Sequence, residues 1–151
     1  MGSGGLGMKR KRNVCLVMAA MLVAMPVAAQ AADGPPFRPA VAGGDLLFLS
    51  GQIGQVPQGA DPDGAGFDDA ARGAMDALGK VLAAHGRSYA DVVKCTVMLA
   101  DMGKWARFNT VYASYFAQDR WPARSAFGGV RLAFDAPLEV ECIATAKRPR
   151  R

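Results

Sequence analysis

Histidine and cysteine are scarce in this 151-residue sequence, which contains one histidine and three cysteines. The histidine, His85, precedes Gly86 at the expected end of a helix and has no group of ligating residues near it in the sequence. Transition-metal sites are built from several histidine, cysteine or carboxylate ligands. The sequence therefore argues against a metal site.

Acidic residues are absent before Asp33, and the net charge of +5 belongs to the ends of the chain. Four of the 18 basic residues lie at positions 9–12, and four more lie in the tail at positions 147–151. The chain between these two groups carries a net charge of −3. Such a body attracts phosphate backbones little, so we expect no nucleic-acid partner. We interpret the tail as a solvated terminus, with contact to an anionic surface as the alternative.

The N-terminal segment has the pattern of a signal peptide. After the basic residues 9–12 comes an apolar run, Val14 to Ala24, whose 11 residues are too few to span a membrane. Pro26 ends this segment, and Ala29-Gln30-Ala31 has the small-x-small pattern of a cleavage site. We predict a signal peptide over 1–31, with Met8 as a possible true start. Cleavage after Ala31 would give a periplasmic or secreted protein that does not remain in the membrane, and an uncleaved anchor is the alternative.

Two cysteines, Cys95 and Cys142, remain in the mature chain, and both lie in segments with strand-like patterns. Isolated thiols in strands are usually small buried hydrophobic groups, and we expect that here. An oxidising compartment permits a disulfide, which is the alternative.

Hydrophobic spacing predicts one domain over residues 32–146, with the element order ββαβαββ. The expected strands are 37–42, 46–50, 92–100, 123–132 and 138–146, and the expected helices are 67–85 and 104–116. The uniformly apolar strand 46–50 predicts burial on both of its faces. The aromatic stripe of the second helix, Trp105 to Phe116, predicts a place in the core.

This order predicts an α+β fold with two layers, in which both helices pack on one face of a mixed sheet. The other face of the sheet then needs a cover. In so short a chain the simplest cover is another subunit, so we expect an oligomer.

Five segments resemble the RidA (YjgF-type) family, and they occur in the order and at the spacing found in that family. Together they span nearly the whole mature chain. They are Asp45–Ile53, Asp91–Leu99, Asn109 with Tyr112, Tyr115 and Phe116, Pro122–Ala126, and Leu138–Ala144. The resemblance implies a chorismate-mutase-like fold and a homotrimer, whose three sheets form an inner barrel with pockets between subunits. It also implies hydrolytic deamination of reactive 2-imino acids, as by a 2-iminobutanoate/2-iminopropanoate deaminase, without metal or organic cofactor.

The resemblance assigns the site residues one by one. Arg124 matches the key arginine of the family, and Ser50, Asn109 and Glu139 match positions that line or support the pocket. Two positions depart from the pattern of the best-studied deaminases: Ala40 replaces a tyrosine that reaches into a neighbouring pocket, and Ala126 replaces a cysteine.

The residue types suit this chemistry. A guanidinium binds a carboxylate through two hydrogen bonds, so Arg124 would anchor the imino acid as a catalytic and substrate-binding residue. Glu139 would orient or deprotonate the attacking water, and Ser50 would hydrogen-bond the substrate.

Structural interpretations of the same residues remain open. Arg124 could pair with Glu139 or Glu141 across strands, and Glu139 could form an intersubunit ion pair. Ser50 could only stabilise a turn, and we interpret Asn109 chiefly as a support for the pocket.

Three functions follow as hypotheses, and all start from the same fold. The first is an exported deaminase of imines and enamines. The second is a non-catalytic trimer that binds a small molecule or a partner in the same pocket. The third is an activity on RNA, against which the charge of −3 and the predicted export both count.

Overall fold

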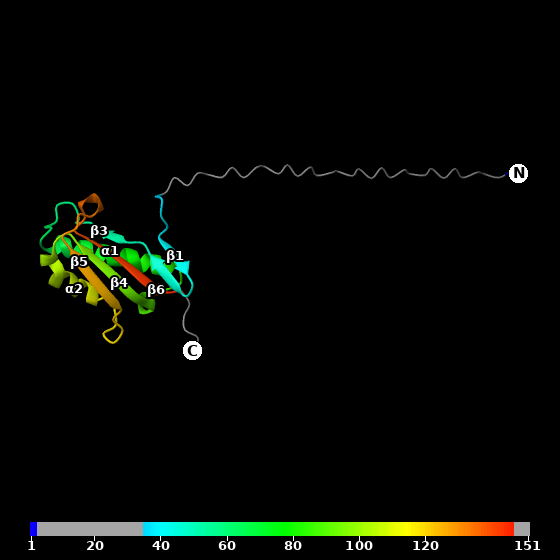
Figure 1. Cartoon of the computed structure of the whole chain (residues 1–151). Coiled ribbons are helices and arrows are strands. Elements are labelled where there is room, and N and C mark those ends of the chain that lie inside the picture. The colour runs from blue at the N-terminus through cyan, green and yellow to red at the C-terminus, as the bar shows by residue number, and fades with distance from the viewer. Residues whose placement is uncertain (3–34, 147–151) are drawn as a thin grey trace. The chain divides into compact units, whose positions relative to one another are not determined.

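The computed structural model describes residues 1–2 and 35–146, so the predicted signal peptide, beyond its first two residues, and the basic tail fall outside the described residues. The helices and strands are β1 (Ala40–Gly43), β2 (Leu46–Leu49), β3 (Gln52–Gly54), α1 (Ala65–Ala84), β4 (Val92–Leu99), α2 (Trp105–Ala113), β5 (Ala123–Gly128) and β6 (Leu138–Thr145) (Figure 1). All the expected elements are present, but β1 begins at Ala40 and not at residue 37, and β5 ends at Gly128 and not at residue 132. The strand β3 is an additional strand of three residues. None of the described helices is long and apolar enough to cross a membrane.

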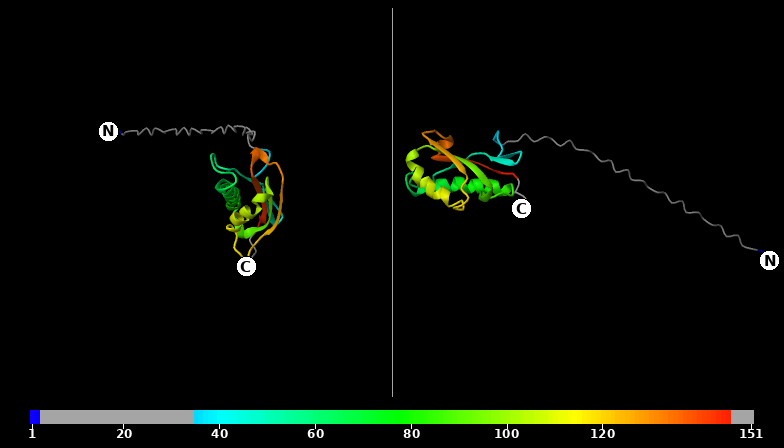
Figure 2. Two further views of the ribbon diagram at one scale, coloured as in Figure 1. Left: turned by 90° about the vertical axis from the view of Figure 1, so that its left-hand side faces the viewer. Right: turned by 60° about the horizontal axis from the view of Figure 1, so that its bottom comes forward.

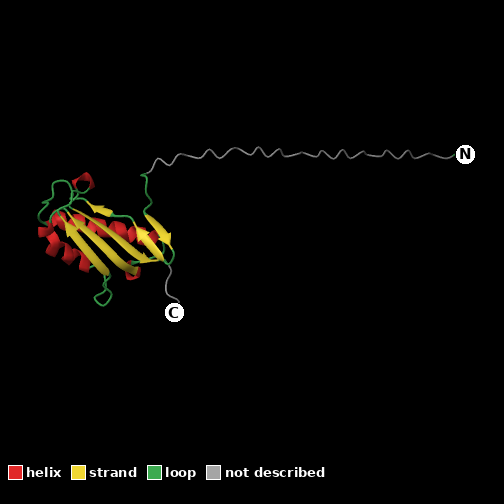
Figure 3. Ribbon diagram, in the orientation of Figure 1, coloured by secondary structure: helices red, strands yellow, loops and turns green. Residues whose placement is uncertain are grey.

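The strands form one mixed sheet in the order β1-β2-β6-β4-β5, with β3 paired to β6 beyond the end of β2 (Figure 3). The β4–β5 pair is parallel, and the other pairs are antiparallel. The parallel pair follows from the crossover through α2, because a strand that returns by way of a helix runs in the same direction. The strand β5 lies at an edge of the sheet, where its outer side has no neighbouring strand in the described chain.

Both helices cover the same face of the sheet (Figure 2), which confirms the predicted two-layer α+β architecture. Along the inner strands every second side chain is buried against these helices, as the period of two in a strand requires. The buried core contains Leu47, Leu49, Phe67, Met75, Leu78, Leu82, Cys95, Val97, Leu99, Phe108, Leu138, Val140 and Cys142.

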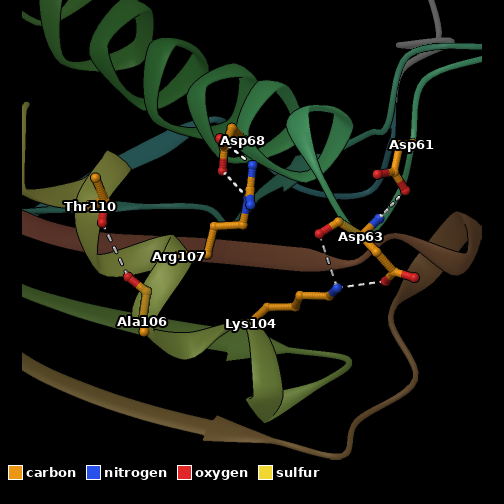
Figure 4. Close-up of polar contacts among 7 residues, drawn as sticks. All are labelled: Asp61, Asp63, Asp68, Lys104, Ala106, Arg107 and Thr110. Atoms are coloured by element: carbon orange, nitrogen blue, oxygen red, sulfur yellow. Dashed lines mark hydrogen bonds and ion pairs between the residues drawn. The ribbon is translucent and has the colours of Figure 1, made fainter.

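One ion pair joins the two helices, and a second joins the segments that precede them (Figure 4). The guanidinium of Arg107 in α2 donates hydrogen bonds of 2.6 and 2.8 Å to the two carboxylate oxygens of Asp68 in α1. Just before α2, Nζ of Lys104 lies 2.5 Å from the carboxylate of Asp63. These contacts accompany the core packing of Phe108, Val111 and Tyr112, which holds α2, the helix that carries part of the candidate site. The helix ends at Ala113, three residues earlier than predicted.

The two cysteines form a disulfide, and the expectation of separate thiols was wrong. Cys95 of β4 and Cys142 of β6 are partners in the antiparallel register, and their Cα atoms lie 4.1 Å apart. Directly opposed positions of neighbouring strands bring the two side chains within bonding reach on the same face of the sheet. The bond is buried beneath the helices.

Within residues 35–146, no helix covers the second face of the sheet. Four large apolar residues on it, Val41, Leu46, Phe48 and Phe127, are 37–51% exposed. The prediction that strand 46–50 is buried on both faces is therefore wrong for the subunit alone, because Leu46 and Phe48 alternate with the buried Leu47 and Leu49. An apolar face of this kind is typical of a surface that contacts a partner.

Candidate functional site

A cavity of about 300 Å³ lies between α2 and the beginning of β5, at the open edge of the sheet. Its lining consists of Asn109, Tyr112, Ala113, Trp121, Pro122 and Arg124. The structure thus brings together two of the predicted site residues, Arg124 and Asn109. The volume of the cavity falls at the lower end of the range for small-molecule sites.

Arg124 is held against α2 by two aromatic rings. Its guanidinium carbon lies 4.5 Å from the ring centroids of both Trp105 and Tyr112. Contacts of this kind stabilise a cation by about 0.5–2 kcal/mol each and fix the plane of the guanidinium. Within residues 35–146 no carboxylate forms an ion pair with Arg124. The site therefore holds a fixed positive charge whose counter-ion the described residues do not supply.

Two polar oxygen atoms beside this charge also lack partners. Within the described part of the chain, Oδ1 of Asn109 and the hydroxyl of Tyr112 are buried and make no hydrogen bond. Burial raises the pKa of Tyr112 to about 12, although the nearby Arg124 opposes this shift. The hydroxyl is thus protonated at neutral pH and can donate a hydrogen bond. Buried polar groups are normally satisfied, so this arrangement favours a polar ligand or bound water in the cavity.

The other two predicted site residues, Glu139 and Ser50, do not line this cavity. Glu139 pairs with Ile53 of β3 and Met98 of β4 on the face of the sheet without helices. Its carboxylate lies against the backbone of Gly51, where an added Cβ would be 2.8 Å from Cδ of the glutamate. Ser50 donates a hydrogen bond of 2.6 Å to the carbonyl of Arg38, which agrees with the alternative that it stabilises the local backbone.

Arg124 and Glu139 point to opposite sides of the sheet. Arg124 is the register partner of Cys95, which faces the helices, whereas Glu139 is the partner of Met98 on the other face. Strand residues three apart, such as Cys95 and Met98, always face opposite ways. The alternative that Arg124 pairs with Glu139 or Glu141 across strands is therefore wrong within one subunit.

The two departures from the family pattern lie on opposite edge strands of the sheet, Ala126 in β5 and Ala40 in β1. Ala126 follows Arg124 by two residues in β5, on the same face, and packs against the core. Ala40 begins β1 and also packs against the subunit's own core.

Sequence reasoning missed Tyr112 and Trp121 as parts of the site. Tyr112 was assigned to the core by the spacing of the aromatic stripe, and it is indeed buried. Its position one helical turn after Asn109 was the available signal that both side chains share a face. Trp121 lies in a loop, where no periodicity indicates its direction.

Residues 28–146 match the family described as Endoribonuclease L-PSP, the YjgF/RidA family. The chain belongs to this family. It is 38% identical over 110 residues to "Reactive Intermediate Deaminase A, chloroplastic" from Arabidopsis thaliana, covering 73% of this chain and 58% of that protein. The chain thus spans less than two thirds of the Arabidopsis relative.

Two other members are similar over most of their length. A Bos taurus protein named 2-iminobutanoate/2-iminopropanoate deaminase is 36% identical over 116 residues, with coverage of 77% of this chain and 83% of that protein. The crystal structure of Escherichia coli TdcF with bound serine superposes with a TM-score of 0.63 at 33% identity, with coverage of 74% and 88%. The predicted RidA-like fold is therefore confirmed, and small-ligand binding is recorded for a relative.

Proposed function

We propose that the protein is an exported RidA-type deaminase, which hydrolyses reactive 2-imino acids to 2-oxo acids and ammonia without a metal or organic cofactor. The observation that carries this proposal is the guanidinium of Arg124, which is fixed between two rings in a cavity and has no carboxylate partner within residues 35–146. The names of its relatives support the same activity class.

The reaction adds water to the carbon of the C=N bond, and the resulting carbinolamine loses ammonia to give the 2-oxo acid. Arg124 would bind the substrate carboxylate through both arms of its fork and fix the position of the imine carbon. Oδ1 of Asn109 would accept a hydrogen bond from the imine N–H, and the Tyr112 hydroxyl would donate to the carboxylate. Glu139 would orient the water, accept its proton and pass it to the imine nitrogen. The carbinolamine hydroxyl would then give up its proton by the same route, and ammonia would leave.

Glu139 can reach such a substrate only from a neighbouring subunit, since it lies on the other face of its own sheet. A homotrimer would supply it. The exposed apolar residues of the sheet face without helices, Phe48 and Phe127 among them, support burial of that face in an inner barrel. The site of each subunit would then consist of Arg124 from one chain and Glu139 from the next.

A periplasmic or secreted location agrees with two independent features. One is the predicted signal peptide over 1–31. The other is the Cys95–Cys142 disulfide, because structural disulfides persist mainly in oxidising compartments. The net charge of −3 between residues 12 and 147 supports a small-molecule substrate over a nucleic acid.

The test is hydrolysis of imines that an amino-acid oxidase generates in the presence of semicarbazide, which competes for them. We expect the purified protein to lower the yield of semicarbazone, and the Arg124→Ala variant to have no such effect. If the protein and the variant both behave like buffer while the protein is folded and oligomeric, the deaminase proposal is wrong.

A second candidate function is ligand binding without turnover. The Ser50 hydroxyl donates its hydrogen bond to the Arg38 carbonyl, so it cannot donate to a substrate at the same time. The loss of this expected substrate contact favours binding without turnover. It predicts that amino or imino acids bind in an Arg124-dependent manner and that ammonia is not released.

A further inference from the structure

Trp121 is the largest apolar group in the lining of the Arg124 cavity, and it is exposed. Its side chain lies in the loop before β5 and is 49% exposed. Its ring centroid is 6.3 Å from that of Phe116, so one side of the indole is supported. Trp121 is also one of the residues that line the cavity. Aromatic surface of this size is normally buried, which makes it a strong candidate for ligand contact.

The lining separates into two chemical parts. The polar groups come from Arg124, Asn109 and Tyr112, and these suffice for a carboxylate and an N–H group. The other lining residues are Ala113, Trp121 and Pro122, none of which carries a polar side chain except for the indole N–H. A ligand that satisfies the polar part therefore extends its side chain along an apolar wall.

Within a single subunit, the volume of the cavity exceeds what a short substrate needs. About 300 Å³ corresponds to roughly ten waters of liquid at about 30 Å³ each. A three-carbon imino acid would leave most of this space to water beside the indole. Ala113, which also lines the cavity, carries only a methyl group and takes up little of this space. A larger apolar side chain would displace that water and cover the ring.

We propose that Trp121 is a specificity-determining residue that selects 2-amino or 2-imino acids with a large apolar side chain, aromatic ones above all. The proposal rests on the function proposed above for the same site. It adds the class of substrate. A difference of one methylene in an apolar pocket changes discrimination about 10–200-fold, so a benzyl group should be preferred over a methyl group by at least tenfold.

The test is equilibrium binding by calorimetry, with L-phenylalanine and L-alanine as stable ligands that carry the carboxylate and N–H groups. The protein is purified after expression of the full chain. We expect phenylalanine to bind at least about tenfold more tightly than alanine. Trp121→Ala should reduce this preference to less than about threefold, whereas Trp121→Phe should retain most of it. The readout in each variant is the ratio of the dissociation constants for phenylalanine and alanine, so an equal change in both affinities does not count as a loss of preference.

The same preference is expected in kcat/KM for imines generated from the two amino acids. Equal binding of both ligands by the unaltered protein, or an unchanged preference in Trp121→Ala, would overturn the inference. A Trp121→Ala variant that loses the oligomeric state of the parent, measured by light scattering, would also overturn it, because Trp121 would then serve assembly. A preserved binding preference without imine turnover would support the inference and count against the deaminase proposal alone.

Discussion

The side chains of Arg124 and Glu139 leave opposite faces of one sheet, because Arg124 shares its register with Cys95 and Glu139 shares its register with Met98. Among the described residues, 1–2 and 35–146, a single subunit holds a cation without an ion-pair partner at an edge strand and a carboxylate on the face without helices. Any reaction that uses both groups on one substrate requires two subunits.

Replacement of Arg124 by lysine tests whether the shape of the cation matters as well as its charge. Lysine keeps the charge but loses the two-pronged hydrogen bonding and the stacking on Trp105 and Tyr112. We expect kcat/KM for imine hydrolysis to fall by about 10–100-fold, in line with the loss of a charge-assisted hydrogen bond of 1.5–3 kcal/mol. The semicarbazide competition assay measures this change in kcat/KM. A lysine variant as active as the parent would show that a point charge is enough.

Gly51 is predicted to position Glu139. A Cβ at residue 51 would overlap the glutamate carboxylate, while the flexible end of that side chain can move away. We therefore expect Gly51→Ala to lower kcat to a similar extent as Glu139→Gln, with a change in unfolding free energy of less than about 1 kcal/mol. Steady-state kinetics and urea denaturation provide the two readouts. A Gly51→Ala enzyme with unchanged kcat would show that the position of Glu139 does not matter for the reaction.

Tyr112 should make the protein less stable at alkaline pH. Its pKa is about 12 in the folded chain and about 10 when unfolded. Between these values the folded state holds a proton that the unfolded state has released. The free energy of unfolding therefore falls as pH rises, by up to about 1.4 kcal/mol per pH unit from this residue.

The matched control is Tyr112→Phe, which removes the titrating group and keeps the ring. Urea denaturation at about pH 9 and at about pH 11 should show a smaller loss of stability for the variant than for the parent. Equal losses in the two proteins would mean that Tyr112 titrates normally. Below about pH 9 the two stability curves should run parallel.

The disulfide should stabilise the sheet directly behind the candidate site. Cys95 and Cys142 are 47 residues apart, and Arg124 pairs in register with Cys95. Closing a chain segment of this length typically contributes about 2–4 kcal/mol. We expect a reducing agent to lower the urea midpoint of the parent and not that of a Cys95→Ala/Cys142→Ala variant. Detection of two free thiols per unfolded chain without reductant would contradict the bond.

The general fold was predictable because its helices and inner strands have strong periodicity. Alternation in Val92–Leu99 and the helical spacing after Phe67 both reflect burial on one side, which is the dominant force in folding. The helix end at His85 and Gly86 followed from the left-handed conformation that glycine accepts there, with φ of 66°.

Features that depend on pairing between distant segments were not predictable. The strand β3 has three residues, too few to show an alternating pattern. The Cys95–Cys142 bond required the register of β4 against β6, which composition does not reveal. Placing Arg124 and Glu139 on opposite faces requires two registers, that of β5 against β4 and that of β6 against β4. Resemblance identified these two residues but could not show which face each occupies.

The most direct test of a site shared between subunits is complementation between two inactive variants. Arg124→Ala and Glu139→Gln subunits would be purified, each shown to lack imine hydrolysis, and then unfolded and refolded together as an equimolar mixture. If each site takes Arg124 from one subunit and Glu139 from the next, random assembly restores about one quarter of the sites. The mixture should therefore regain up to about a quarter of the parental activity, while a mixture of the parent with the double variant serves as the reference. A mixture as inactive as its components, although the subunits have exchanged, would contradict a site shared between subunits.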